Sequence, residues 1–172
     1  MHTEQNDTRI RISQLSNGLH EYHFSPAASG IGLGSNFQRS VVIDATIEKS
    51  GRQLYLQADV RTSGLFQCDR CVEEFEHNVS ASFSVLYVYD GLDAGRSTDD
   101  EVRVISPETP QLDLADDIRE TVMLSVPLKL LCKENCKGLC PHCGVNLNRR
   151  TCSCEDENVD GRWESLENFI DQ

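Results

Sequence analysis

Every cysteine in this 172-residue chain has another cysteine within four residues of it. Two thiolates at that spacing can face one tetrahedral metal ion, and a second pair from elsewhere in the chain can complete the coordination shell. A closed shell made only of cysteine is typical of structural zinc. The sequence therefore predicts two zinc sites of four cysteines each, with the ligands Cys68, Cys71, Cys132, Cys136, Cys140, Cys143, Cys152 and Cys154.

Two ways of combining the cysteine pairs remain open. In the first, the pair Cys68–Cys71 joins Cys132–Cys136, and Cys140–Cys143 joins Cys152–Cys154. The second of these sites is local, and short loops cost little closure entropy, so it can form as a ribbon-like module. In the alternative, Cys132–Cys136 joins Cys140–Cys143, which leaves Cys152–Cys154 for the upstream pair.

Three other uses of the cysteines compete with zinc. A disulfide framework suits an exported protein, and the N-terminal sequence MHTEQNDTRI has no signal-peptide core. Thiol–disulfide exchange or redox sensing at Cys68 and Cys71 would need a βαβ context, which the residue pattern does not indicate. An iron–sulfur cluster also uses cysteine alone, and spacing does not exclude it.

The residue pattern favours a protein that is not an enzyme. A catalytic zinc keeps one coordination position open and usually has histidine or carboxylate ligands, unlike a closed shell of four cysteines. The chain has no HExxH motif, phosphate-binding loop or evident Ser-His-Asp arrangement. The remaining enzymatic alternative is a thiol–disulfide oxidoreductase or redox sensor that uses Cys68 and Cys71.

Charge is distributed unevenly along the chain. The formal net charge is −12 and the pI is about 4.7, which opposes binding to nucleic acid through the overall field. One stretch is basic, and it either contacts RNA or a partner or balances the thiolates, through Lys129, Lys133, Lys137, Arg149 and Arg150. No apolar run reaches membrane-spanning length, so we expect a cytoplasmic protein without a membrane partner.

The elements that must position the cysteines are mostly β-strands. Residues 9–25 alternate polar and apolar around Asn17-Gly18, which predicts a hairpin. The glycine-rich stretch 25–35 is expected to be a flexible connector. Residues 40–49, 54–62 and 74–89 alternate as strands of a β meander, with Cys68–Cys71 at a hairpin tip, and residues 102–105 form a short strand.

One main helix follows the strands. It is expected over about residues 113–125, with Asp113 as N-cap and Pro127 beyond its end. The fold class is therefore α+β: an antiparallel β meander packed with one helix, plus a small Cys-rich module resembling a zinc ribbon. We expect a β-rich domain over residues 1–131. Residues 132–172 would form the zinc-binding module and an acidic tail, in which Trp163 and Leu166 could lie on one face of a short helix.

These motifs together resemble the bacterial large ribosomal RNA subunit accumulation family, the YceD-like proteins. The similarity lies in CDRC (Cys68–Cys71), in LDLADDIRETVMLSVPL, in CKGLCPHCGVNLN (Cys136–Asn148) and in CSC (Cys152–Cys154). The resemblance covers most of the chain from about residue 40.

The resemblance implies a function in a pathway more than a reaction. It implies a non-catalytic accessory protein of large ribosomal subunit biogenesis that supports synthesis, processing or stability of 23S rRNA. The expected partner is the large-subunit precursor, through 23S rRNA or a basic ribosomal protein, with no small-molecule substrate.

Overall fold

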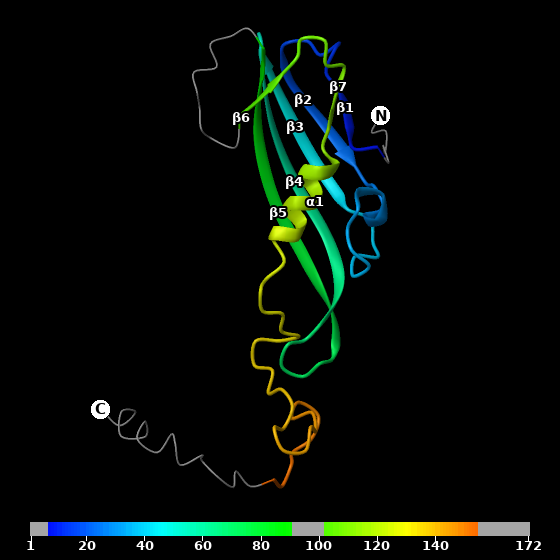
Figure 1. The fold of residues 1–172 in the computed structure, drawn as a ribbon, viewed down its shortest axis with the longest axis vertical. Helices are drawn as coiled ribbons and strands as arrows, with labels where there is room; N and C mark the ends of the chain where they lie inside the picture. The colour runs from blue at the N-terminus through cyan, green and yellow to red at the C-terminus, as the bar shows by residue number, and fades with distance from the viewer. Residues whose placement is uncertain (1–6, 91–101, 155–172) are drawn as a thin grey trace, which may run out of the picture.

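The computed structural model describes residues 7–90 and 102–154, and a five-stranded sheet forms its centre (Figure 1). The strands lie side by side in the order β2 (Gly18–Phe24), β3 (Val42–Ser50), β4 (Gln53–Gln67), β5 (Glu74–Tyr89) and β6 (Val102–Ile105). The first four form the expected antiparallel meander. The short strand expected at residues 102–105 joins this sheet as β6, and it pairs with β5 in parallel.

The predicted hairpin over residues 9–25 is wrong. Strand β1 (Arg9–Arg11) pairs with β7 (Gln111–Asp113) in a separate two-stranded sheet, while β2 pairs with β3. Alternation predicts that a segment is a strand, but it does not specify the partner strand. Here Ile10 and Ile12 are fully buried in the core, which places β1 over the main sheet instead of at its edge.

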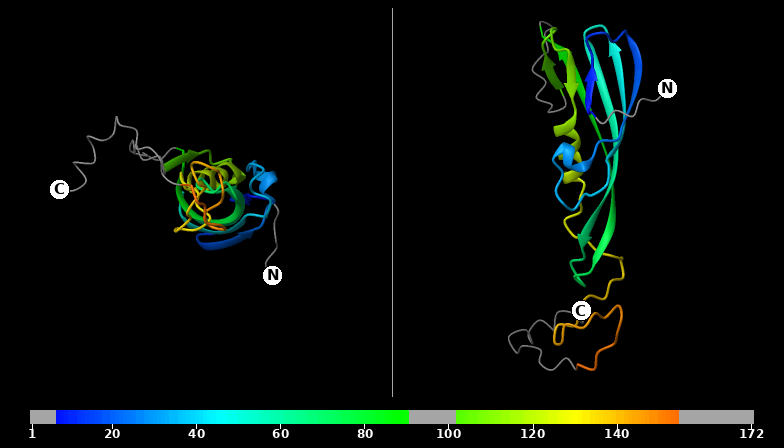
Figure 2. Two further views of the ribbon diagram at one scale, coloured as in Figure 1. Left: turned by 90° about the horizontal axis from the view of Figure 1, so that it is seen from below. Right: turned by 90° about the vertical axis from the view of Figure 1, so that its right-hand side faces the viewer.

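The core lies on one face of the main sheet. In β4 the alternate residues Leu54, Leu56, Ala58 and Val60 are all buried, as their pattern predicts. Helix α1 (Ala115–Leu124) and the 3-10 helix η1 (Ala28–Ile31) cover this face (Figure 2). The glycine-rich stretch is therefore more than a connector, because Ile31 and Leu33 also pack into the core.

The predicted main helix is confirmed, with a different start. Leu114 is the N-cap residue, and Asp113 lies one position earlier, where its carboxylate accepts hydrogen bonds from the Ala115 N–H and the Thr8 hydroxyl. Within the helix, Asp117 is buried and forms a bidentate ion pair with Arg103 of β6. That pair ties the helix to the parallel edge strand.

Strands β4 and β5 extend well beyond the rest of the sheet and carry the cysteine turn at their far end (Figure 1). The chain leaves α1 as a linker that returns to this turn, and the segment that ends at residue 154 continues beyond it (Figure 2). The fold thus brings residues separated by about 60 positions to one end of the molecule. None of the helices in the described residues is long and apolar enough to cross a membrane.

Candidate metal sites

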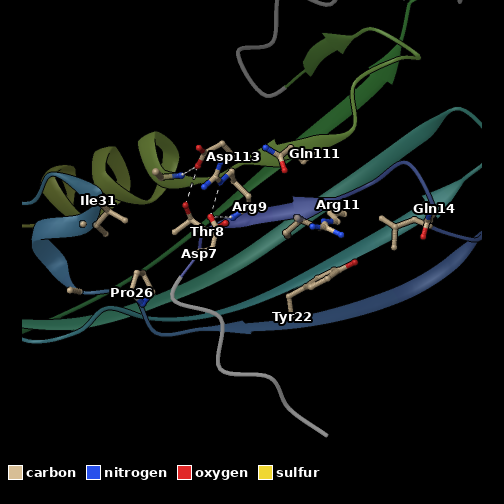
Figure 3. A pocket seen from close by; sticks show the side chains of 15 residues that line it. Asp7, Thr8, Arg9, Arg11, Gln14, Tyr22, Pro26, Ile31, Gln111 and Asp113 are labelled. Atoms are coloured by element: carbon tan, nitrogen blue, oxygen red, sulfur yellow. Dashed lines mark hydrogen bonds and ion pairs between the residues drawn. The ribbon is translucent and has the colours of Figure 1, made fainter.

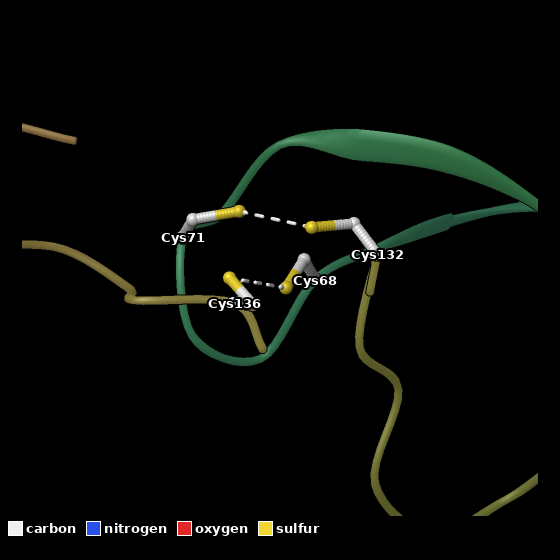
Figure 4. Close-up of side chains that lie close together, drawn as sticks. All are labelled: Cys68, Cys71, Cys132 and Cys136. Carbon is white, nitrogen blue, oxygen red and sulfur yellow. Dashed lines mark hydrogen bonds between the residues drawn. The ribbon is translucent and has the colours of Figure 1, made fainter. Parts of the chain in front are cut away.

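The first cysteine group lies at the tip of the β4–β5 hairpin (Figure 4). Cys68 and Cys71 come from the turn, and Cys132 and Cys136 come from the linker after α1. The Cys68 and Cys136 Sγ atoms lie 3.8 Å apart, and those of Cys71 and Cys132 lie 3.7 Å apart. All four sulfurs lie within 4.8 Å of one another, so one metal ion can sit between them.

The sulfur spacing matches tetrahedral coordination. An ion with metal–sulfur bonds of about 2.3 Å holds its four sulfurs about 3.8 Å apart at the corners of a tetrahedron. A disulfide would instead need an S–S distance of about 2.04 Å. The observed distances of 3.7 and 3.8 Å therefore suit ligands around a single ion and do not favour a dithiol couple.

Backbone hydrogen bonds shape the turn that presents the first two cysteines. The Cys68 N–H donates to the Glu73 carbonyl at 2.9 Å, and the Val72 N–H donates to the Cys68 carbonyl at 2.9 Å. Val72 has φ 61°, a left-handed conformation that valine rarely adopts. The turn therefore curls tightly enough to direct both sulfurs to the same side.

Polar contacts hold the linker against this turn. The Asp69 N–H donates to the Leu130 carbonyl at 2.8 Å, and the Leu130 N–H donates to the Asp69 carboxylate at 2.6 Å. The Arg70 guanidinium donates to the Cys136 carbonyl at 2.8 Å. The residues between the two turn cysteines thus bind the segments that carry the other two ligands.

The second group joins Cys140 and Cys143 with Cys152 and Cys154, and these sulfurs also lie within 4.8 Å of one another. The first pairing considered above therefore matches the structure. Hydrogen bonds from the Cys140 N–H to the Val145 carbonyl and from the Gly144 N–H back to the Cys140 carbonyl, both 2.9 Å, close its turn. This group is the more exposed of the two.

The thiols of the first group ionise unequally. Burial raises the pKa of Cys68, but backbone N–H groups of Cys132, Cys71 and Arg70 outweigh it and lower the pKa to about 6. Burial, followed by the neighbouring sulfurs, raises the pKa of Cys132 to about 12. The first thiol therefore ionises readily, and its negative charge disfavours ionisation of the neighbouring thiols. A bound cation compensates this repulsion.

The second group has the same asymmetry. Backbone N–H groups of Cys143 and His142 lower the pKa of Cys140 to about 6. Contact with the Cys143 sulfur, followed by burial, raises the pKa of Cys154 to about 12. Each group therefore contains one thiol with a lowered pKa and one with a raised pKa, and a bound cation favours the thiolate form of both.

The second group is docked on the first through the backbone. The Leu139 N–H donates to the Arg70 carbonyl at 3.1 Å, and Gly138 packs so closely that an added Cβ would lie 3.0 Å from that carbonyl oxygen. Gly138 also has φ 75°, so this position favours glycine on two counts. Asn148, in the loop of the second group, lies 3.3 Å from the Cys136 sulfur of the first.

All five predicted basic contact residues are exposed. Their side chains do not all have the same surroundings, because Arg149 forms an ion pair with Glu73 at 2.7 Å. This ion pair links the loop of the second cysteine group to the residue that directly precedes β5. The other four side chains point cationic groups at solvent around the cysteine end: Lys129, Lys133, Lys137 and Arg150.

A large open cleft lies elsewhere, between β1, β2 and η1 (Figure 3). It has a volume of about 1430 Å³, and among the described residues neither a cysteine nor a histidine lines it. Most of its charged side chains are already engaged: Asp7 pairs with Arg9 at 2.8 Å, and Asp113 accepts from Thr8. The cleft therefore adds no support to a thiol-based reaction.

Several residues that shape the site carry no clear signal in the sequence. Asp69, Arg70 and Asn148 are ordinary polar residues, and their contacts span 61, 66 and 12 positions. Gly138, between two cysteines, and Gly144, directly after a Cys-x-x-Cys pair, are the residues of the described cysteine segments whose type indicates a constrained backbone. Cysteine spacing predicts the ligand candidates but not the residues that hold them in place.

Comparison with known proteins identifies the family. Residues 56–170, which include all eight cysteines, match the family described as large ribosomal RNA subunit accumulation protein YceD. The chain belongs to this family. No solved structure matches it.

Individual relatives come from bacteria and plants. An uncharacterized protein of Mycobacterium tuberculosis is 29% identical over 150 residues, covering 86% of this chain and 71% of the relative. The chloroplastic YCED homolog 1 of Arabidopsis thaliana, named as a large ribosomal RNA subunit accumulation protein, is 27% identical over 77% of this chain and 49% of its own length. The Zea mays homolog of the same name is 27% identical, and the match covers 74% of this chain and 53% of the relative. The chain thus spans about half the length of these plant proteins.

Proposed function

We propose that this chain is a non-catalytic accessory protein of large ribosomal subunit biogenesis, which supports the synthesis, processing or stability of 23S rRNA in the cytoplasm. Membership of the YceD family carries this proposal, because the matching segment covers residues 56–170 and the plant relatives are named for the same process. No small-molecule substrate is part of this function.

We assign one zinc ion to each cysteine group. The sulfur separations of 3.7 and 3.8 Å support a single tetrahedral ion in the first group. Zinc is commonly coordinated by four thiolates and has no redox chemistry of its own. It often stabilises the fold of short segments that have no large hydrophobic core. Its role here would be to fix the linker and the following module to the β4–β5 tip.

The partner surface would be the exposed basic end of the molecule. Lys129, Lys133, Lys137 and Arg150 place positive charge there, while the net charge of the whole chain is −12. Local cations can bind phosphates of 23S rRNA, and the acidic remainder would limit non-specific RNA binding. Arg149 would act mainly through its ion pair with Glu73.

The division into a body over residues 1–131 and a metal-binding module over residues 132–172 remains a prediction. The first cysteine group takes ligands from both sides of that boundary. A chain cut at residue 131 would therefore lack half of the first site, so functional tests should use the full chain.

The function can be tested by RNA binding at several salt concentrations. Replacing Lys129, Lys133, Lys137 and Arg150 with alanine should weaken binding of the full chain to 23S rRNA. It should also reduce the slope of log affinity against log salt by about 0.7 to 0.9 for each phosphate that the variant no longer binds. A matched control replaces four exposed arginines on the body: Arg11, Arg39, Arg52 and Arg119.

The outcome distinguishes two ways of acting on the ribosome. Weaker binding for the first variant but not the control supports direct RNA contact through the basic end. Equal binding by both variants would contradict that contact and point to a basic ribosomal protein as partner. A cell lacking this protein should accumulate less 23S relative to 16S rRNA, and unchanged accumulation would contradict the proposed function itself.

A further inference from the structure

Asn148 belongs by sequence to one cysteine group and by contact to the other. It lies in the loop between Cys143 and Cys152, both members of the second group. Its side-chain amide nitrogen lies 3.3 Å from the Sγ atom of Cys136, a member of the first group. An amide N–H directed at a thiolate stabilises the charged form that binds metal.

The orientation of this side chain is fixed by its other contacts. The Asn148 Oδ1 atom accepts the Lys137 N–H at 2.9 Å, so the amide contacts both the Cys136 sulfur and the backbone N–H of the next residue. Its Nδ2 atom also donates to Asn146 Oδ1 at 3.0 Å, and that oxygen accepts the Asn148 N–H at 2.9 Å. Turning the amide over would place its oxygen against the sulfur and its NH2 group against an N–H, so only one orientation suits these partners.

The position of Asn148 depends on the shape of its loop. Backbone contacts hold the loop start, including the Leu147 N–H to the Gly138 carbonyl at 2.9 Å and the bridge between Leu139 and Asn146. The far end of the loop carries Cys152 and Cys154, whose sulfurs lie within 4.8 Å of those of Cys140 and Cys143. An ion bound by all four sulfurs closes the loop and removes alternative conformations.

We propose that Asn148 is a positioning residue that couples the two groups, so that metal bound in the second group strengthens metal binding in the first. This inference rests on the two proposed zinc sites. Coupling between binding sites is reciprocal, so metal in the first group must strengthen the second by the same factor. The contacts of Arg70 with the Cys136 carbonyl and with Leu139 provide the structural continuity in that direction.

A double-mutant cycle on the full chain tests the coupling. The zinc-loaded protein is equilibrated with increasing chelator, the released thiols are alkylated, and peptide mass spectrometry identifies which cysteines no longer hold zinc. Cys152→Ser empties the second group and should weaken zinc binding by the first about tenfold, as should Asn148→Ala. The double variant should be no weaker than either single variant, because both changes remove one shared interaction.

The outcomes separate this inference from the zinc proposal. Additive losses, or a first group unaffected by Cys152→Ser, would overturn the coupling while leaving both zinc sites in place. A wild-type chain that binds no zinc would overturn the sites and the coupling together. Asn135→Ala is the matched control, because Asn135 is exposed and adjacent to Cys136; a tenfold loss there would also count against a specific role for Asn148.

Discussion

Val72 and Gly144 have the same left-handed backbone conformation, each directly after the second cysteine of a Cys-x-x-Cys turn. Their φ angles are 61° and 72°. In both turns the N–H of this residue donates to the carbonyl of the first cysteine at 2.9 Å. The two turns therefore share one backbone design, but only the second has the glycine that favours it.

Val72→Gly should stabilise the protein slightly. A left-handed conformation costs a residue with a Cβ about 1 to 2 kcal/mol, and the extra entropy of glycine in the unfolded chain offsets about 0.5 to 1 kcal/mol of that gain. We expect a net increase of about 0.5 to 1 kcal/mol in the free energy of unfolding, measured by urea denaturation. Val104→Gly is a matched control at an exposed strand position, where glycine should destabilise. Equal destabilisation by both changes would contradict the strain at Val72.

Gly138→Ala should loosen the second cysteine group from the hairpin tip. Position 138 has φ 75°, and the new Cβ would lie 3.0 Å from the Arg70 carbonyl oxygen. The expected cost is about 1 to 2 kcal/mol, because the backbone must leave the left-handed region or push the turn away. The measurement is chemical denaturation together with the rate of zinc release. Gly30→Ala, where an added Cβ meets nothing within 4 Å, should have little effect on either.

Arg103→Met should destabilise the body through Asp117. The Asp117 side chain is only 10% exposed, and Arg103 binds both of its carboxylate oxygens. Removing the guanidinium leaves a nearly buried negative charge without its partner, which should cost about 2 kcal/mol. The companion change Asp117→Asn in the same chain should recover part of that loss, because it removes the charge. A double variant as unstable as the sum of the two single variants would argue against this explanation.

Asp44 should contribute to stability in a pH-dependent way. A hydrogen bond from His23 at 2.7 Å, with the nearby Arg61 guanidinium, lowers the pKa of Asp44 below its usual value of 3.8. A carboxyl group with a lowered pKa in the folded state stabilises the protein above the unfolded pKa, and this contribution is lost as pH falls through the folded value. Because Asp44 is 45% exposed, the effect is small, a few tenths of a kcal/mol.

The test compares Asp44→Asn with wild type at two pH values. The variant should be less stable than wild type at about pH 6, and this difference should shrink at about pH 2, because falling pH protonates Asp44 and removes the charge that His23 and Arg61 stabilise. Thermal unfolding in the presence of a metal chelator measures the difference without a contribution from zinc release. Asp59→Asn, directly opposite Asp44 in the β3–β4 register, is the control and should cause no such loss at the higher pH. The same deficit for Asp44→Asn at both pH values would contradict the electrostatic origin.

The sequence predicted the parts of the fold that depend on local pattern. Alternating residues such as Leu54 to Val60 predicted β4, and the spacing of Leu114, Ile118 and Val122 predicted the buried face of α1. The sequence pattern did not correctly predict every pair of strands. The pairing of β1 with β7 joins Ile10 to Leu112 across about 100 residues, and no local pattern specifies such a partner.

The candidate metal sites show the same limit. Cysteine spacing predicted the eight candidate ligands, and short loop length favoured the grouping that the structure has. The supporting contacts depend on how the linker meets the hairpin tip. The hydrogen bonds of Asp69 with Leu130 and of Asn148 with Cys136 form only when the linker packs against the hairpin tip. They could therefore not be predicted from the sequence.

Metal content of the full chain, purified under reducing conditions, tests the central claim most directly. Elemental analysis should find two zinc ions for each chain, and a thiol reagent should find no readily reactive cysteine until a chelator is added. One zinc ion with about four reactive thiols would contradict the second site. Iron in place of zinc, or eight free thiols without metal, would contradict the proposal that zinc fixes the linker to the β4–β5 tip.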